Sequence, residues 1–282
     1  MRLWRSIVTV LRTRLVWLLM RAVPYERLYA WHRRGWLAPL EALLLRGDLA
    51  ILGGPAVRMR LQARSFAPWG AQAYAVLTGT HEVQVQEALR RTVGAGDVVW
   101  DVGANIGALS LGAARIVGPT GRVVAVEPEA GCAAAIRANA ARNGLTWLEV
   151  RAVAATDRSR PVELIVVGDT LWTRLASSGE HELLTDRRVV PGCALDDLDA
   201  PPPTLVKIDV EGAELEVLAG MRRLLAEVQP VVVCEMHGAN REFCAAMQAA
   251  GYAVLNLDGP EPVATAGVNV HALCVPRGRL AA

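Results

Sequence analysis

The stretch from residue 98 to residue 107 combines residue types that bind small organic ligands. An apolar run ends at Asp101, and Gly103, Asn105 and Gly107 follow across a tight turn. Ligands of open α/β sheets bind beyond the carboxyl ends of strands, where glycines let the backbone approach closely. The spacing differs from the dinucleotide pattern G-x-G-x-x-G, and an acid at the strand end would repel a pyrophosphate. The stretch therefore favours a ligand that carries a positive amine.

An acid at the end of the next apolar run adds a second contact. Glu127 follows Gly107 by 20 residues, and a carboxylate there can accept hydrogen bonds from both hydroxyls of a ribose. A ligand with an amine at one strand end and a ribose at the next matches S-adenosylmethionine, which is the predicted cofactor. The alternative is a generic glycine turn followed by a surface glutamate.

Three acids follow the apolar run 205–208 within six residues: Asp209, Glu211 and Glu214. Asp209 and Glu211 are candidates to orient or deprotonate an acceptor hydroxyl, or to hold a divalent metal through oxygen ligands. Glu214 is assigned to the positive end of the following helix. Lys207, the only lysine, lies inside the apolar run and needs a partner if buried. Pairing with a neighbouring acid is favoured over orienting the acceptor.

The next apolar run, 231–234, delivers Glu235 and His237 to the same predicted edge. A histidine with an ordinary pKa near 6.5 suits a general base for a hydroxyl. Glu235 and His237 therefore join Asp209 and Glu211 as predicted catalytic residues. No role is predicted for His32, His81 and His271.

Regular alternation of strands and helices positions these residues. Helices are predicted over 83–93, 106–116, 130–143, 213–227 and 241–250, and strands over 98–100, 122–126, 148–152, 162–167, 205–208, 231–234, 252–257 and 268–275. Short turns between them imply a mainly parallel sheet covered on both faces. The last two strands have no helix between them, which indicates one antiparallel strand. Residues 168–188 are predicted to be a loop that brings Trp172 and His181 near the acceptor.

Four motifs in this order resemble the FkbM family of S-adenosylmethionine-dependent methyltransferases. They are DVGANIG at 101–107, VEP at 126–128, LDDL at 195–198 and VKIDVEGAE at 206–214. The resemblance covers roughly residues 80–276. It implies the seven-stranded class I methyltransferase fold, with the last strand antiparallel, and O-methylation of a hydroxyl on a sugar, glycan, glycolipid or natural product. The alternatives are a nicotinamide-dependent oxidoreductase and a non-catalytic adaptor at a membrane surface.

Residues 1–80 precede the predicted methyltransferase domain, 81–282, and lie outside the resemblance. Residues 1–46 hold nine arginines and two glutamates, a net charge of +7. Apolar residues between positions 4 and 22 recur at helical spacing with arginines on both sides. Such a basic amphipathic helix packs on a domain with its arginines extended, or lies on an anionic membrane. Residues 47–80 are predicted to form a small strand cap.

Composition limits the remaining classes of protein. The 282 residues are 52% apolar and 21% charged with a net charge of +2, which excludes intrinsic disorder. No apolar run is long enough to span a bilayer. Five scattered cysteines without a C-x-x-C pair indicate neither a zinc site nor a disulfide framework. The expectation is a cytoplasmic protein, at the inner membrane face if its basic helix binds lipid, with no nucleic-acid partner.

Overall fold

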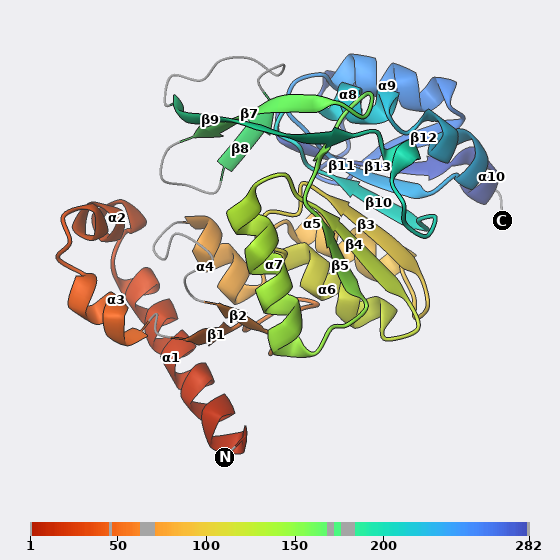
Figure 1. Ribbon diagram of the computed structural model, residues 1–282. Coiled ribbons are helices and arrows are strands. Elements are labelled where there is room, and N and C mark those ends of the chain that lie inside the picture. The colour runs from red at the N-terminus through yellow and green to blue at the C-terminus, as the bar shows by residue number, and fades with distance from the viewer. Residues whose placement is uncertain (1, 45–46, 63–70, 168–171, 176–183, 281–282) are drawn as a thin grey trace.

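A computed structural model describes residues 2–44, 47–62, 71–167, 172–175 and 184–280 (Figure 1). Its central sheet has seven strands in the order β12-β13-β11-β10-β3-β4-β5. The strands are β3 (Val98–Val102), β4 (Arg122–Val126), β5 (Leu148–Arg151), β10 (Leu205–Ile208), β11 (Val231–Met236), β12 (Tyr252–Asn256) and β13 (Val270–Pro276). In this sheet β13 runs antiparallel to both of its neighbours, β11 and β12, whereas the other six strands all run in one direction. The predicted class I methyltransferase sheet, with an antiparallel final strand, is confirmed.

Helices cover both faces of the sheet because successive strand residues point to opposite sides. One face packs against α5 (Val83–Thr92), α6 (Ala108–Val117) and α7 (Ala130–Asn143), and the other against α8 (Glu214–Ala219) and α9 (Asn240–Ala249). In β3, Val99 belongs to the first core and Trp100 to the second. The helix predicted over 213–227 is broken after Ala219, and a π-helical turn follows at Leu224–Val228. Short helical segments also occur at Leu195–Asp197, Val263–Thr265 and Arg277–Leu280.

The chain forms a second sheet in addition to the central one, and part of it falls where a loop was predicted. It contains β6 (Ala154–Ala155), β7 (Pro161–Val167), β8 (Trp172–Leu175) and β9 (Leu184–Cys193), with β7 antiparallel to both β8 and β9. The prediction of a loop over 168–188 was therefore wrong for residues 172–175 and 184–188, and the rest of that range lies outside the described residues. Exposed residues of β9, such as Arg187, Arg188 and Val189, give no buried alternation by which the strand could be recognised. Trp172 lies in β8, and His181 lies outside the described residues.

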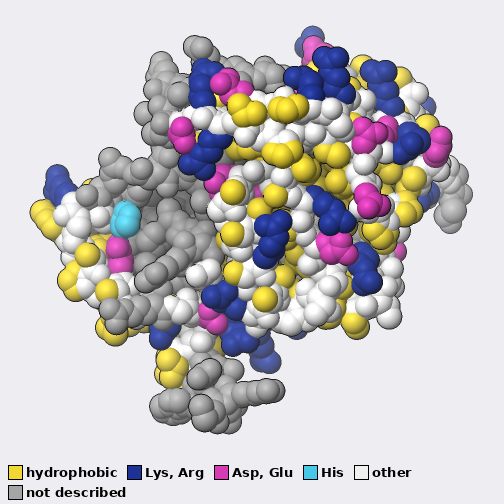
Figure 2. All heavy atoms as spheres, viewed as in Figure 1, with side chains coloured by type: hydrophobic (Ala, Val, Ile, Leu, Met, Phe, Trp, Pro, Cys, Tyr) yellow, Lys and Arg dark blue, Asp and Glu magenta, His cyan; other side chains and the backbone are white. Residues whose placement is uncertain are grey.

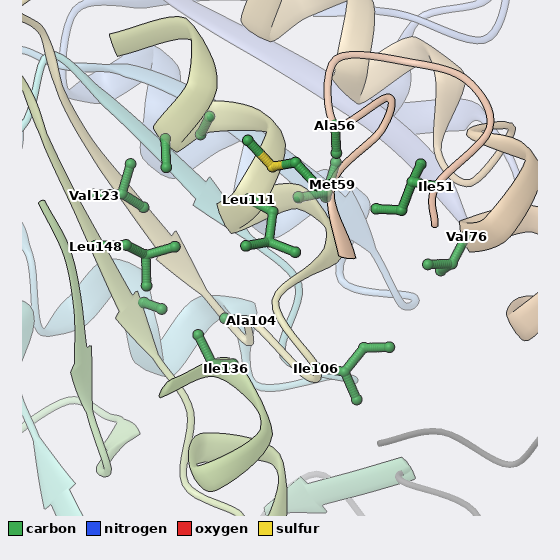
Figure 3. Close-up of a cluster of buried hydrophobic side chains, with 14 of the residues drawn as sticks. Ile51, Ala56, Met59, Val76, Ala104, Ile106, Leu111, Val123, Ile136 and Leu148 are labelled. Atoms are coloured by element: carbon green, nitrogen blue, oxygen red, sulfur yellow. The ribbon is translucent and has the colours of Figure 1, made fainter. Parts of the chain in front are cut away.

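The N-terminal segment forms α1 (Arg2–Ala22), α2 (Tyr25–Arg33), α3 (Ala38–Leu44), β1 (Asp48–Ala50), β2 (Arg60–Gln62) and α4 (Ala71–Thr78). The antiparallel pair β1–β2 is the predicted strand cap, whereas α4 was not predicted. Ile51, Met59 and Val76 pack in one core with residues of the central sheet and its helices (Figure 3). The segment thus shares the core of the domain, and the proposed boundary at residue 80 stays a prediction.

Helix α1 has two different faces. Val16 is fully buried, and the Thr13 hydroxyl accepts a hydrogen bond of 2.7 Å from the Ala50 backbone N–H. Apolar side chains on another side remain exposed: Ile7, Leu11, Leu15 and Leu18. Among the described residues, no helix has the length and apolar character needed to cross a membrane. On the face of the molecule in Figure 2, acidic and basic side chains are interspersed.

Candidate active site

Strand register gathers the predicted site residues at one edge of the sheet, where the parallel strands end. Lys207 of β10 lies opposite Asp101 of β3, and Glu235 of β11 lies opposite His271 of β13. Residues opposite each other in a register point to the same face. Charged groups from four strands therefore lie near one another, and Glu82, which precedes α5, lies beside Glu235 and His271.

The glycine turn after β3 lies directly against the end of β10. Gly103 has a φ of +77°, and a Cβ there would lie 1.6 Å from the backbone oxygen of Asp209. Gly107 precedes α6 with a φ of +82° and packs closely on Ile136. Asn105 also adopts a left-handed conformation, with a φ of +51°. The turn requires glycine at position 103 because the turn after β3 touches the backbone that follows β10 there.

Glu127 lies at the end of β4 and is 4% exposed. Its two carboxylate oxygens accept 2.8 Å hydrogen bonds from the backbone N–H groups of Asn105 and Glu129. Burial raises the pKa of Glu127 to about 7, although these two backbone hydrogen bonds act in the opposite direction. The carboxylate thus fixes the glycine turn and titrates near neutral pH.

Asp101 and Lys207 form a buried ion pair beneath this turn. The Lys207 Nζ lies 3.7 Å from an Asp101 oxygen and 3.2 Å from an Asp209 oxygen. Burial opposes the charge of Lys207, but Asp209, Glu82 and Asp101 raise the pKa of the ammonium. The predicted pairing of Lys207 with neighbouring acids is confirmed. Asp101 is 2% exposed and faces the chain's own ammonium, so its contact with a ligand amine stays a prediction.

The four predicted catalytic residues meet around one imidazole. The His237 Nε2 lies 3.5 Å from Glu211, 3.9 Å from Asp209 and 3.8 Å from Glu235. We call these residues, together with Glu214, the His237 cluster. The cluster brings carboxylates from the ends of β10 and β11 to one point.

Glu214 has a role that the sequence did not reveal. It lies in the first turn of α8, as predicted, but its side chain is fully buried and contacts His237 Nδ1 at 2.8 Å. Glu214 thus lies at the helix terminus as predicted and also pairs with His237, which was not predicted. Burial opposes protonation of His237, yet the hydrogen bond to Glu214 and the nearby acids raise its pKa to about 9. At neutral pH the His237 ring is thus a proton donor in this structure.

Glu211 differs from the other carboxylates in its backbone. It has a φ of +54°, a conformation that costs energy for any residue but glycine and that concentrates at functional sites. Its side chain is 35% exposed, the largest value among the acids that face His237 Nε2. Burial and the neighbouring Asp209 raise the pKa of Glu211. Glu211 thus combines access from solvent with a carboxylate that binds a proton more readily than usual.

Two further residues, Glu82 and His271, reach this edge without having been predicted. Glu82 precedes α5, and His271 lies near the start of β13. The sequence did hold a signal for His271. An antiparallel last strand begins at the edge where the parallel strands end, so its first residues belong to the site.

Comparisons with known proteins find several methyltransferases that are similar to this chain. The chain is 28% identical over 211 residues to the hexuronic acid methyltransferase AglP of Haloferax volcanii, which covers 72% of this chain and 80% of that protein. Similar solved structures include a precorrin-6Y C5,15-methyltransferase from Geobacter metallireducens, with 19% identity, a TM-score of 0.44 and coverage of 75% of this chain and 94% of that chain. Another is methyltransferase FkbM from Methylobacillus flagellatus, with 16% identity, a TM-score of 0.42 and coverage of 75% and 56%.

The family pattern described as the methyltransferase FkbM domain matches residues 101–254. This range begins at Asp101 in β3 and includes Glu127 and the whole His237 cluster. Because the match covers more than half of the chain, the protein belongs to the FkbM family of methyltransferases.

Proposed function

We propose that the protein uses S-adenosylmethionine to methylate a hydroxyl group of a sugar-containing acceptor. The observation that carries the proposal is the contact between Gly103 and Asp209, which joins a ligand-binding turn to a cluster of proton-binding groups. The relative from Haloferax volcanii is named for methylating hexuronic acids, and this supports a sugar as the acceptor. Membership in a methyltransferase family disfavours the nicotinamide alternative.

The residues after β3 and β4 fit the proposed cofactor. An ionised carboxylate has about four lone-pair positions, and backbone N–H groups occupy two of them on Glu127. The remaining positions can accept both hydroxyls of a ribose. Gly103, Asn105 and Gly107 would form the backbone wall of the site. S-adenosylmethionine, when bound, supplies an electrophilic methyl group on a sulfonium.

The acceptor would lie at the His237 cluster. Glu211 is the proposed base because it is accessible and its pKa is raised. His237, protonated at neutral pH, would donate a hydrogen bond to an acceptor oxygen, and Asp209 and Glu235 would hold the acceptor in place. Glu214 would orient His237 through Nδ1. The sequence left both His237 and the carboxylates as candidates for the base, and this division of roles favours a carboxylate.

Calorimetry with Glu127→Gln tests the cofactor site. We expect micromolar binding of S-adenosylmethionine by the wild type, and roughly 10- to 100-fold weaker binding by the variant, because hydrogen bonds to a charged acceptor are lost. The wild-type affinity should rise as the pH increases through about 7, the pKa of Glu127, since only the ionised form offers all its lone pairs. The variant should lack this rise.

The matched control is Glu149→Gln, the same change in the half-exposed acid of the next strand, β5. It should bind the cofactor as the wild type does. Failure of the folded wild type to bind, or equal binding by Glu127→Gln, would reject the proposed cofactor site. Transfer of labelled methyl to a panel of glucuronate- and galacturonate-containing oligosaccharides then tests the acceptor class.

We also propose that α1 contacts an anionic lipid surface. Its exposed apolar residues, Ile7, Leu11, Leu15 and Leu18, follow helical spacing, and Arg14 and Arg21 are exposed beside them. An apolar stripe flanked by arginines suits a helix that lies in a membrane interface. Thr13 and Val16 anchor the opposite side to the domain, so the helix need not detach.

Flotation with vesicles containing phosphatidylglycerol tests this contact. The double variant Leu11→Glu plus Leu18→Glu should lose most of the flotation, because it places charge on the apolar stripe without disturbing Val16. Leu255→Glu, a similarly exposed position on β12, is the matched control and should float like the wild type. Equal flotation of the double variant and the control would exclude the lipid contact.

A further inference from the structure

Glu82, Glu235 and His271 form a second group of potential ligands, which we call the His271 cluster. One ligand atom from each residue lies within 4.8 Å of the other two. The residues come from the start of α5, from β11 and from β13. Glu235 belongs to both clusters, because its two oxygens face His237 and His271 at 3.8 Å each.

Asp258 fixes the orientation of the His271 ring. Its carboxylate lies 3.0 Å from His271 Nδ1 and also accepts a hydrogen bond from the His271 backbone N–H. A carboxylate at Nδ1 keeps the proton on that nitrogen and leaves a lone pair on Nε2. The Nε2 atom points towards Glu235, but their separation of 3.8 Å is too long for a hydrogen bond.

Two polar atoms of the cluster are buried without a hydrogen-bond partner among the described residues. They are one carboxylate oxygen of Glu82 and Nε2 of His271. The Glu82 side chain is 9% exposed and the His271 side chain is 11% exposed. A buried polar atom without a partner is costly and calls for an unseen group that satisfies it.

The charges around the cluster favour a cation as that group. Two of the three residues, Glu82 and Glu235, are carboxylates, and their ligand atoms lie within 4.8 Å of each other. The nearest ammonium, Lys207, is held between Asp101 and Asp209. His81 Nε2 lies 2.7 Å from one Glu82 oxygen. The other Glu82 oxygen and His271 Nε2 are the two acceptors of the cluster that have no donor among the described residues.

We propose that Glu82, Glu235 and His271 bind one divalent cation of the Mn²⁺ or Zn²⁺ type. Two carboxylates and one imidazole suit these ions, whereas Mg²⁺ and Ca²⁺ prefer oxygen ligands alone. The hydrogen bond between Asp258 and His271 is the second contact that metal-binding histidines characteristically make. The three residues leave coordination positions open, so the cation can also bind an oxygen from outside the chain.

A cation there would lie next to the proposed acceptor site, because Glu235 faces both histidines. It would lower the pKa of an acceptor hydroxyl that binds to it. This use in methyl transfer rests on the proposed function, whereas the binding of the cation does not. Binding is therefore measured without S-adenosylmethionine or acceptor, so its failure is distinct from failure of the proposed activity.

The experiment titrates the full chain with Mn²⁺ and follows the free ion by electron paramagnetic resonance, with Zn²⁺ as a competitor. We expect one ion per chain with micromolar affinity and displacement by Zn²⁺. Glu82→Gln and His271→Gln should each weaken binding at least tenfold. Asp258→Asn should weaken it roughly 10- to 100-fold, as expected for loss of a residue that orients a ligand.

His32→Gln is the matched control, because His32 lies in α2 and pairs with Glu41. Circular dichroism verifies that each variant is folded. If one of the two ligand variants, Glu82→Gln and His271→Gln, does not fold, the other still tests the site. Glu211→Gln tests the neighbouring His237 cluster and should leave the affinity for Mn²⁺ within a few-fold of the wild type. Absence of binding by the folded wild type would overturn the proposal. Binding that depends on Glu211 and not on Glu82 and His271 would overturn it as well.

Discussion

The variant Glu211→Gln should lose a factor of roughly 10²–10⁴ in kcat, the usual contribution of a general base. Glutamine has nearly the same shape as glutamate, but it cannot accept the proton of an acceptor hydroxyl. Affinity for S-adenosylmethionine should not change, because Glu211 follows β10 and makes no contact with Glu127. The measurement pairs methyl transfer to the best uronate acceptor of the panel with calorimetry of cofactor binding.

Loss of folding would not explain such a result. The folded protein raises the pKa of Glu211, so its ionised form is disfavoured relative to the unfolded chain, and the resulting cost to stability grows as the pH rises through that pKa. Neutral glutamine removes this cost. The variant should therefore melt at or above the wild-type temperature at neutral pH.

Glu216→Gln is the matched control for this substitution. Glu216 lies in the first turn of α8, shortly after Glu211 in the sequence, but it is not part of the His237 cluster. The control should keep the wild-type kcat. If Glu211→Gln retains kcat within twofold while His237→Gln loses it, the histidine is the base and the assignment to Glu211 is wrong.

Sequence alone predicted the edge of the sheet where the site lies. Four apolar runs are followed by an acid: Asp101, Glu127, Asp209 and Glu235. Because parallel strands share a carboxyl edge, these acids are expected at the same edge of the sheet. Such runs are recognised because their buried residues are nearly all apolar on both faces. The seven strands of the central sheet appear close to their predicted positions for this reason. The helices predicted over 83–93, 106–116, 130–143 and 241–250 also appear near their predicted bounds.

Contacts between distant side chains were not predictable in this way. Glu214 reaches His237 across 23 positions of sequence, and a glutamate in a first helical turn already has a sufficient local explanation. Glu82 precedes a helix with a φ of +46°, which no local pattern indicates. His271 required combining the antiparallel direction of β13 with its register against Glu235.

The contact between the two halves of the site predicts a severe effect for Gly103→Ala. The new Cβ would lie 1.6 Å from the Asp209 backbone oxygen, well inside the sum of the atomic radii, and backbone rather than a flexible side chain would have to move. A left-handed alanine adds about 1–2 kcal/mol of strain. Together these should lower the free energy of unfolding by about 4 kcal/mol or more, a large part of the usual 5–15 kcal/mol. Urea denaturation measures the loss.

Gly144→Ala separates the steric contribution from backbone strain. Gly144 follows α7 in a left-handed conformation, with a φ of +69°, and a Cβ there would meet nothing within 4 Å. Its variant should lose only the strain of about 1–2 kcal/mol. Equal losses at positions 103 and 144 would mean that the turn and the end of β10 can separate freely. A much larger loss at position 103 means that they form one rigid unit, as required of a site in which the cofactor turn and the acceptor cluster must keep a fixed separation.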